Sequence, residues 1–80
     1  MAKKVVIYTT DYCPYCRAAK DFLASKGVSF QEVDVTDDDA TREKIAALSG
    51  RQTVPQIFAD DVSLGGYEDL VRFYRDGKAL

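Results

Sequence analysis

The sequence contains no histidine, no tryptophan and only two cysteines. A structural zinc site takes four cysteine or histidine ligands as a rule, so this chain alone cannot supply the usual set. Lysine and arginine (11) are outnumbered by aspartate and glutamate (13), and the net charge of -2 argues against binding to a nucleic-acid backbone. The apolar run Val5 to Tyr8 is far shorter than a membrane span or a signal-peptide core. We therefore expect no bound metal, no nucleic-acid partner and no membrane segment.

Proline and glycine are also scarce, at two and five residues, which leaves little room for flexible linkers. Of the 80 residues, 46% are hydrophobic and 30% are charged, as in compact domains of ordinary composition. A chain of this length builds only one hydrophobic core. The sequence thus predicts a single domain over residues 1–80, which we expect to be a cytoplasmic monomer.

The order of apolar and turn-forming residues predicts alternating strands and helices. Strands are predicted where β-branched and aromatic residues gather: Lys3 to Thr9, Val28 to Val35, Gln56 to Ala59 and Val62 to Leu64. Helices are predicted from Pro14 to Gly27, from Thr36 or Asp37 to Gly50, and from Gly65-Gly66 to Gly77. In the second helix, Ile45 and Leu48 are expected to point into the core.

The resulting order, β-α-β-α-β-β-α, predicts an α/β fold with a four-stranded mixed sheet flanked by helices. The first two strands enclose a helix and should be parallel, whereas the last two should form a hairpin around Asp60-Asp61. The first strand leads directly into the first helix. The segment Cys13-Pro14-Tyr15-Cys16 therefore lies at the carboxyl end of a central strand, where open α/β sheets usually place their functional sites.

Both cysteines lie in this segment, which predicts a redox pair. A bridge between residues so close together removes little entropy from the unfolded chain, so a purely structural role is weakly motivated. Pro14 suits the first position of a helix, which makes Cys13 the capping residue. The helix dipole then favours negative charge on the Cys13 sulfur, while Cys16 lies one turn along on the apolar face. We expect Cys13 to attack and Cys16 to resolve; the alternative is a structural or accidental pair.

Several motifs together resemble those of the glutaredoxins of the small dithiol class. They are Tyr8-Thr9, Cys13-Pro14-Tyr15-Cys16, Thr53-Val54-Pro55 and Gly65-Gly66-Tyr67-Glu68-Asp69-Leu70. The resemblance spans nearly the whole chain and implies a thioredoxin-like fold. It also implies a thiol-disulfide oxidoreductase that uses glutathione as co-substrate, holds no tightly bound cofactor, and reduces protein disulfides and glutathione mixed disulfides.

The resemblance further implies a glutathione groove. Its candidate residues are Tyr15, Arg51, Gln52, Thr53, Val54, Pro55, Gly66, Tyr67 and Glu68. Pro55 is expected to follow a cis bond, so that the Val54 backbone pairs with the cysteinyl part of glutathione. The γ-glutamyl end is expected at Gly66, Tyr67 and Glu68, because helix-start N–H groups bind carboxylates. Arg17, Lys20, Arg51 and Gln52 are candidates to attract or hold the glycyl carboxylate. The simpler alternatives are an ordinary strand-entry proline and an ordinary helix cap.

Two other functions stay open, and one departure from the family pattern supports the first of them. Glutaredoxins often carry a lysine three residues before the first cysteine, where this chain has Thr10. The first alternative is therefore a redoxin that is reduced by thioredoxin reductase and donates electrons to ribonucleotide reductase. The second is a dimeric carrier of an iron-sulfur cluster held by Cys13 and glutathione, which the stiff Pro14 disfavours.

Overall fold

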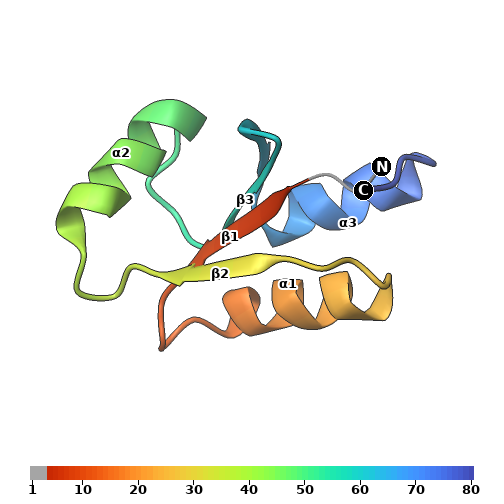
Figure 1. The fold of residues 1–80 in the computed structure, drawn as a ribbon, viewed down its shortest axis with the longest axis horizontal. Helices are drawn as coiled ribbons and strands as arrows, with labels where there is room; N and C mark the ends of the chain where they lie inside the picture. Colours follow the sequence, from red (N-terminus) through yellow and green to blue (C-terminus); the bar gives the residue numbers. More distant parts are fainter. Residues whose placement is uncertain (1–3) are drawn as a thin grey trace.

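The computed structural model describes residues 4–80, and Figure 1 shows how their helices and strands are arranged. In chain order the elements are β1 (Val5–Thr9), α1 (Pro14–Ser25), β2 (Gln31–Asp34), α2 (Asp39–Ser49), β3 (Gln56–Ala59), β4 (Val62–Gly65) and α3 (Tyr67–Arg75). This order is the predicted one. The predicted start of β1 at Lys3 lies outside the described residues.

The strands form one mixed sheet in the order β2-β1-β3-β4. β1 is central, since it pairs in parallel with β2 and antiparallel with β3. β3 and β4 form the predicted hairpin, and its turn residues Asp60 and Asp61 have positive φ angles of 49° and 69°. The four-stranded α/β sheet is thus confirmed, and the end of β1 leads directly to the cysteine segment.

The main core lies between one face of the sheet and the helices α1 and α3. It contains Val5, Ile7, Ala19, Leu23, Ile57 and Leu70, all of which are buried. Phe22 and Tyr74 pack against this cluster with their rings in an edge-to-face arrangement at 5.4 Å. Because α1 packs into this core along its apolar face, the helix start that carries the cysteines is held on a rigid support.

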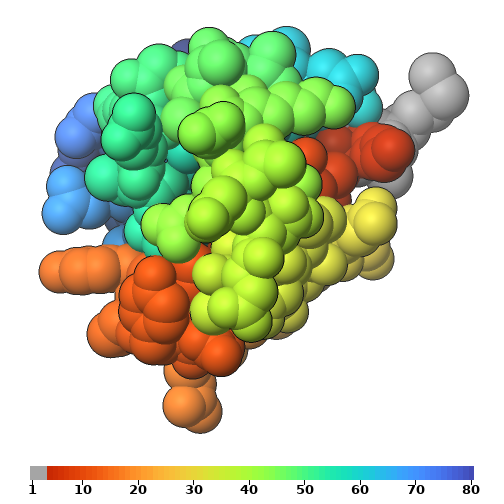
Figure 2. All heavy atoms as spheres, turned by 90° about the vertical axis from the view of Figure 1, so that its left-hand side faces the viewer, coloured from red at the N-terminus to blue at the C-terminus, as the bar shows by residue number. Residues whose placement is uncertain are grey.

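Helix α2 is set apart from α1 and α3 (Figure 1) and buries Ile45. The prediction that Leu48 also points inward is wrong, because its side chain is 65% exposed. Leu48 instead lies at the rim of a shallow groove with Tyr8 and Phe58, whose rings stack edge to face at 5.7 Å. In Figure 2, which faces the α2 side, part of β1 (red) remains visible beside the green helix. Because α2 covers only part of the sheet, it buries fewer apolar side chains than their helical spacing predicts.

The start of α2 also differs from the prediction, because its cap is Asp38 rather than Thr36 or Asp37. The Asp38 side chain accepts hydrogen bonds from the Thr41 N–H at 3.1 Å and from its hydroxyl at 2.7 Å. Thr36 is engaged elsewhere: its N–H and hydroxyl both donate to Asp34 Oδ1, and its hydroxyl accepts from the Asp11 N–H. Thr36 therefore closes a turn beside the cysteine loop, and the helix begins after it.

Candidate active site

Cys13 occupies the N-cap position of α1, as predicted. Its backbone is extended (φ -104°, ψ 109°), and its sulfur accepts a hydrogen bond from the Cys16 N–H at 3.2 Å. On its other side, the Cys13 Sγ lies 3.6 Å from the Val54 carbonyl oxygen, to which the protonated thiol donates. Pro14 takes the first helical position, where its missing N–H costs no hydrogen bond. The helix start and its N–H group thus favour negative charge on this sulfur.

Cys16 lies one turn further along α1 and is 1% exposed. Both cysteines are free, so the structure describes the dithiol. Burial raises the pKa of the Cys16 thiol to about 12, and the hydrogen bond that it makes to the Cys13 side chain acts in the same direction. A partly exposed sulfur at a helix start therefore stands beside a buried thiol that stays protonated at neutral pH. This asymmetry allows one cysteine to attack a disulfide and the other to act afterwards.

The loop before β3 lies against this pair. The Val54–Pro55 peptide bond is cis, as the resemblance implies, and Pro55 is buried. A hydrogen bond within the loop stabilises it: the Gln56 side-chain amide donates to the Arg51 carbonyl at 2.8 Å. Val54, the neighbour of the cis bond, is thereby held with its carbonyl facing Cys13.

Most of the predicted groove residues line one groove of about 310 Å³. Its lining consists of Tyr15, Arg51, Thr53, Val54, Pro55, Gly66, Tyr67, Glu68 and Asp69. The rings of Tyr15 and Tyr67 lie 6.2 Å apart and come from the starts of two different helices. The structure thus brings together every predicted groove residue except Gln52.

Asp69 belongs to the motif quoted for the start of this helix but was not among the predicted groove residues. Its carboxylate accepts the Gly66 N–H at 3.0 Å and pairs with the guanidinium groups of Arg51 at 2.6 Å and Arg72 at 3.6 Å. The hydrogen bond from Gly66, followed by the pairing with Arg51, lowers the pKa of this carboxyl group. Gly65 has a φ of +96°, and a Cβ there would collide with the Asp69 carboxylate. The sequence spacing could have predicted this contact, because an acidic residue three positions after a helix cap often accepts a hydrogen bond from the backbone N–H of the cap.

This arrangement affects what the start of α3 can bind. Asp69 already occupies the Gly66 N–H, so the groups left for a ligand are the first-turn N–H groups of Tyr67 and Glu68, which have no acceptor within the helix. Arg51 lies on the same side, at the Gly66 end of the groove. A ligand that carries both an ammonium and a carboxylate group finds partners of both charges here.

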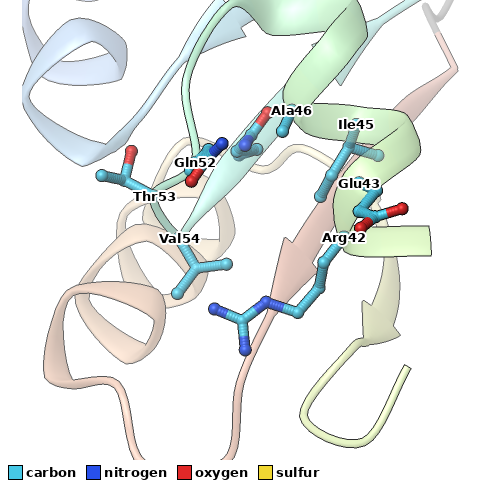
Figure 3. A pocket seen from close by; sticks show the side chains of 8 residues that line it. Arg42, Glu43, Ile45, Ala46, Gln52, Thr53 and Val54 are labelled. Carbon is cyan, nitrogen blue, oxygen red and sulfur yellow. The ribbon is translucent and has the colours of Figure 1, made fainter. Parts of the chain in front are cut away.

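Gln52 lines a second pocket, of about 210 Å³, between α2 and the Val54 loop. Figure 3 shows the Arg42 side chain extending from α2 so that its guanidinium lies beside Val54. No ion pair of Arg42 is found within residues 4–80, and its side chain is half-buried. Thr53 and Val54 line both this pocket and the groove, so the two lie on either side of the same loop. Arg42 was not predicted as a site residue, because only the fold brings α2 next to Val54.

Two aromatic side chains stand out near Cys13, since Tyr12 is 66% and Tyr15 is 60% exposed. In Figure 2, orange side chains from the start of α1 protrude from the surface below α2. Among the described residues, no group of three or more histidine, cysteine, aspartate or glutamate side chains is arranged to hold a metal ion. None of the helices described over residues 4–80 is long and apolar enough to cross a membrane.

Comparison with known proteins finds one family model that matches most of this chain. The model of the glutaredoxin family matches residues 5–64, which include both cysteines and the Thr53-Val54-Pro55 loop. Among curated proteins, glutaredoxin 3 of Escherichia coli is 54% identical over 66 residues, which cover 82% of this chain and 80% of that protein. A glutaredoxin of Pseudomonas aeruginosa is 46% identical over 74 residues, with 92% of this chain and 88% of that protein covered.

Solved structures give the same result at the level of the fold. A complex of buckwheat glutaredoxin with glutathione superposes with a TM-score of 0.89 at 26% identity, covering 95% of this chain and 72% of that one. The solution structure of a Brucella melitensis glutaredoxin has a TM-score of 0.81 at 43% identity, covering 92% of this chain and 80% of that one. The predicted thioredoxin-like fold is therefore confirmed.

Proposed function

Because this chain belongs to the glutaredoxin family, we propose that Cys13 and Cys16 are its redox-active pair and that the two neighbouring pockets hold glutathione. The chain is a glutathione-dependent thiol-disulfide oxidoreductase, in accordance with its family and its curated relatives. What remains to be assigned is which residues do the chemistry and how they divide it.

In the proposed reaction, the Cys13 sulfur attacks a substrate disulfide and forms a mixed disulfide. The observation that carries this assignment is the hydrogen bond from the Cys16 N–H to the Cys13 Sγ at 3.2 Å, because it stabilises the attacking thiolate and the same sulfur when it leaves. The mixed disulfide is then resolved in one of two ways. Cys16 attacks Cys13 to release a protein thiol, or an external glutathione thiol attacks the glutathione held on Cys13.

The proposed pose of glutathione follows the two pockets. The cysteinyl part pairs with the backbone of Val54, which lies between the pockets and faces Cys13. The γ-glutamyl end lies in the groove, where Asp69 and the first-turn N–H groups of α3 match its ammonium and carboxylate groups. The glycyl carboxylate lies in the second pocket, where Arg42 and Gln52 receive it. Arg42 thus supplies the positive charge that Thr10 does not.

This pose modifies the role expected for one predicted residue, Arg51. Arg51 is paired with Asp69, which favours a place at the γ-glutamyl end rather than the glycyl end. Tyr15 and Tyr67 flank the groove and offer apolar faces to the peptide between them. Thr53, Pro55, Gly66 and Glu68 shape the walls of the same groove.

Substitution of each cysteine tests the division of labour. Cys16→Ser should keep the reduction of glutathione mixed disulfides and lose most reduction of protein disulfides, because only the second needs an intramolecular resolving thiol. Cys13→Ser should lose both activities. Loss of both activities in a folded Cys16→Ser variant would contradict the scheme. Running the same assays with thioredoxin reductase in place of glutathione tests the flavoprotein-dependent alternative.

We also propose that the protein acts as a monomer in the cytoplasm on disulfide-bearing or glutathionylated proteins. Such a location supplies the glutathione on which the reaction depends. The exposed Tyr12 and Tyr15 beside Cys13 suit contact with an unfolded or extended protein segment. Sedimentation of the reduced protein with and without glutathione tests the oligomeric state, and a coloured dimer would favour the iron-sulfur alternative.

A further inference from the structure

The resolving step requires the Cys16 thiol to lose its proton, and the surroundings of Cys16 disfavour that loss. Cys16 must lose its proton when it attacks the Cys13 mixed disulfide, yet it is 1% exposed. In the dithiol its pKa is raised to about 12, with burial as the largest cause, and burial also opposes the Cys16 thiolate in the mixed disulfide. Some group near Cys16 has to favour the thiolate as the bond forms, and the proton needs a route to water.

A cavity of about 660 Å³ on the side away from the glutathione groove meets both needs. Both cysteines line it, whereas Tyr15, Val54 and Tyr67 do not. A glutathione molecule or peptide seated in the groove therefore does not cover this cavity. The cavity has polar walls, so water within it can receive a proton.

Besides the Thr10 backbone hydrogen bond, the group in this cavity that favours a Cys16 thiolate is Lys20. It follows Cys16 by four positions on α1, so the two side chains share one face of the helix. Its ammonium is held by Glu32 of β2 at 2.9 Å, and the same Glu32 oxygen accepts a hydrogen bond from the buried Thr9 hydroxyl at 2.7 Å. These two contacts fix the position of the lysine charge. They also lower the pKa of Glu32, which therefore remains a carboxylate.

The other charged groups around the cavity do not duplicate this effect. The complete charged lining is Asp11, Arg17, Lys20, Asp21, Glu32 and Asp34. Four of these six groups are acidic and oppose a new negative charge. Two groups lower the pKa of Cys16: first the Thr10 backbone hydrogen bond, and then the charge of Lys20, which is the one basic residue of this lining with that effect.

We propose that Lys20, positioned by Glu32 and Thr9, promotes the loss of the Cys16 proton in the resolving step, and that the proton leaves through this cavity. The proposal rests on the assignment of Cys16 as the resolving thiol. In this step the Cys16 S–H bond breaks and its proton passes to water in the cavity. The sulfur electron pair forms the Cys16–Cys13 disulfide, the bond from Cys13 to the substrate sulfur breaks, and the departing thiolate takes up a proton from solvent. The dithiol thereby loses two electrons, and the substrate disulfide gains them.

A single reaction with an aromatic disulfide separates the two half-steps. One equivalent of 5,5′-dithiobis(2-nitrobenzoate) first reacts with Cys13 and releases one coloured thiolate, and attack by Cys16 then releases the second. Stopped-flow absorbance measures the two phases separately across pH 5 to 10. Lys20→Met removes the charge and retains most of the stem, Lys20→Arg restores the charge, and Lys44→Met on α2 is the matched control.

The proposal predicts a selective effect on the second phase. In Lys20→Met its rate at pH 7 should fall about three- to tenfold and its pH profile should move upward by about 0.5 to 1 unit, because a nearby charge has been removed. The first phase should change by less than about twofold, while Lys20→Arg and Lys44→Met should resemble the wild type. An unchanged second phase, or equal slowing of both phases, would overturn the proposal. Absence of a second phase in the wild type would instead refute the resolving role of Cys16 itself.

Discussion

The assignment of Arg42 to the glycyl carboxylate can be tested by removing only its charge. Arg42→Met keeps most of the side-chain volume between α2 and Val54, and Arg42 has no ion-pair partner within residues 4–80 that the change would strand. A hydrogen bond to a charged group contributes about 1.5 to 3 kcal/mol, and partial exposure of this side chain places it at or below the lower end of that range. A loss of about 1 to 2 kcal/mol corresponds to a weakening of about five- to thirtyfold.

The assay compares two substrates that differ only at the glycyl carboxylate. These are a glutathione mixed disulfide and the same compound as the glycyl ethyl ester, each reduced by the wild type and by Arg42→Met. The wild type should reduce the ester with a lower kcat/KM than the free acid. Arg42→Met should reduce the two substrates with similar kcat/KM, because the substitution and the ester remove the same interaction. Losses that simply multiply would refute the assignment. Lys44→Met, two positions further along the same helix, should respond to the ester as the wild type does.

Three further predictions concern the support of the site. Leu23→Ala should lower the free energy of unfolding by about 2 to 5 kcal/mol in urea titrations, because Leu23 is fully buried in the core. The lowered pKa of Asp69 means that its contribution to stability is present above the unfolded carboxyl pKa of about 3.9 and is lost as the pH falls through the lower folded value. Thermal melts of Asp69→Asn should therefore lie below the wild type at pH 7 and begin to converge with it only as the pH falls below about 4. Gly65→Ala should raise KM for glutathione mixed disulfides, because a Cβ at a φ of +96° displaces the Asp69 carboxylate; an unchanged KM would count against the role of this cap.

The sequence was sufficient to predict the order of the elements and the central position of β1. Strong apolar runs and the turn residues Asp60-Asp61, Gly27 and Gly50 mark the boundaries locally, so these features did not depend on knowing the fold. The capping role of Cys13 was predictable for the same reason, since Pro14 identifies the first helical position.

The wrong or missing predictions concern residues whose environment is determined by tertiary contacts. Leu48 has the spacing of a core residue, but α2 covers too little of the sheet to bury it. The cap of α2 is Asp38 rather than Thr36 or Asp37, and the Thr36 hydroxyl is engaged with Asp34 instead. Arg42 was not predicted at all, since its place beside Val54 depends on how α2 packs against a loop that follows it in the chain. Periodicity describes one element at a time and cannot supply such contacts.

The site of first reaction in the reduced protein tests directly whether Cys13 is the attacking thiol. Brief treatment with limiting iodoacetamide at about pH 6, followed by fragmentation of the peptide that contains both cysteines, measures how the label divides between them. Cys13 should carry at least about ten times more label than Cys16, because its partly exposed sulfur accepts the helix-start N–H while Cys16 is buried as a thiol. Equal labelling of the two sulfurs, or preferential labelling of Cys16, would contradict the attacking role of Cys13.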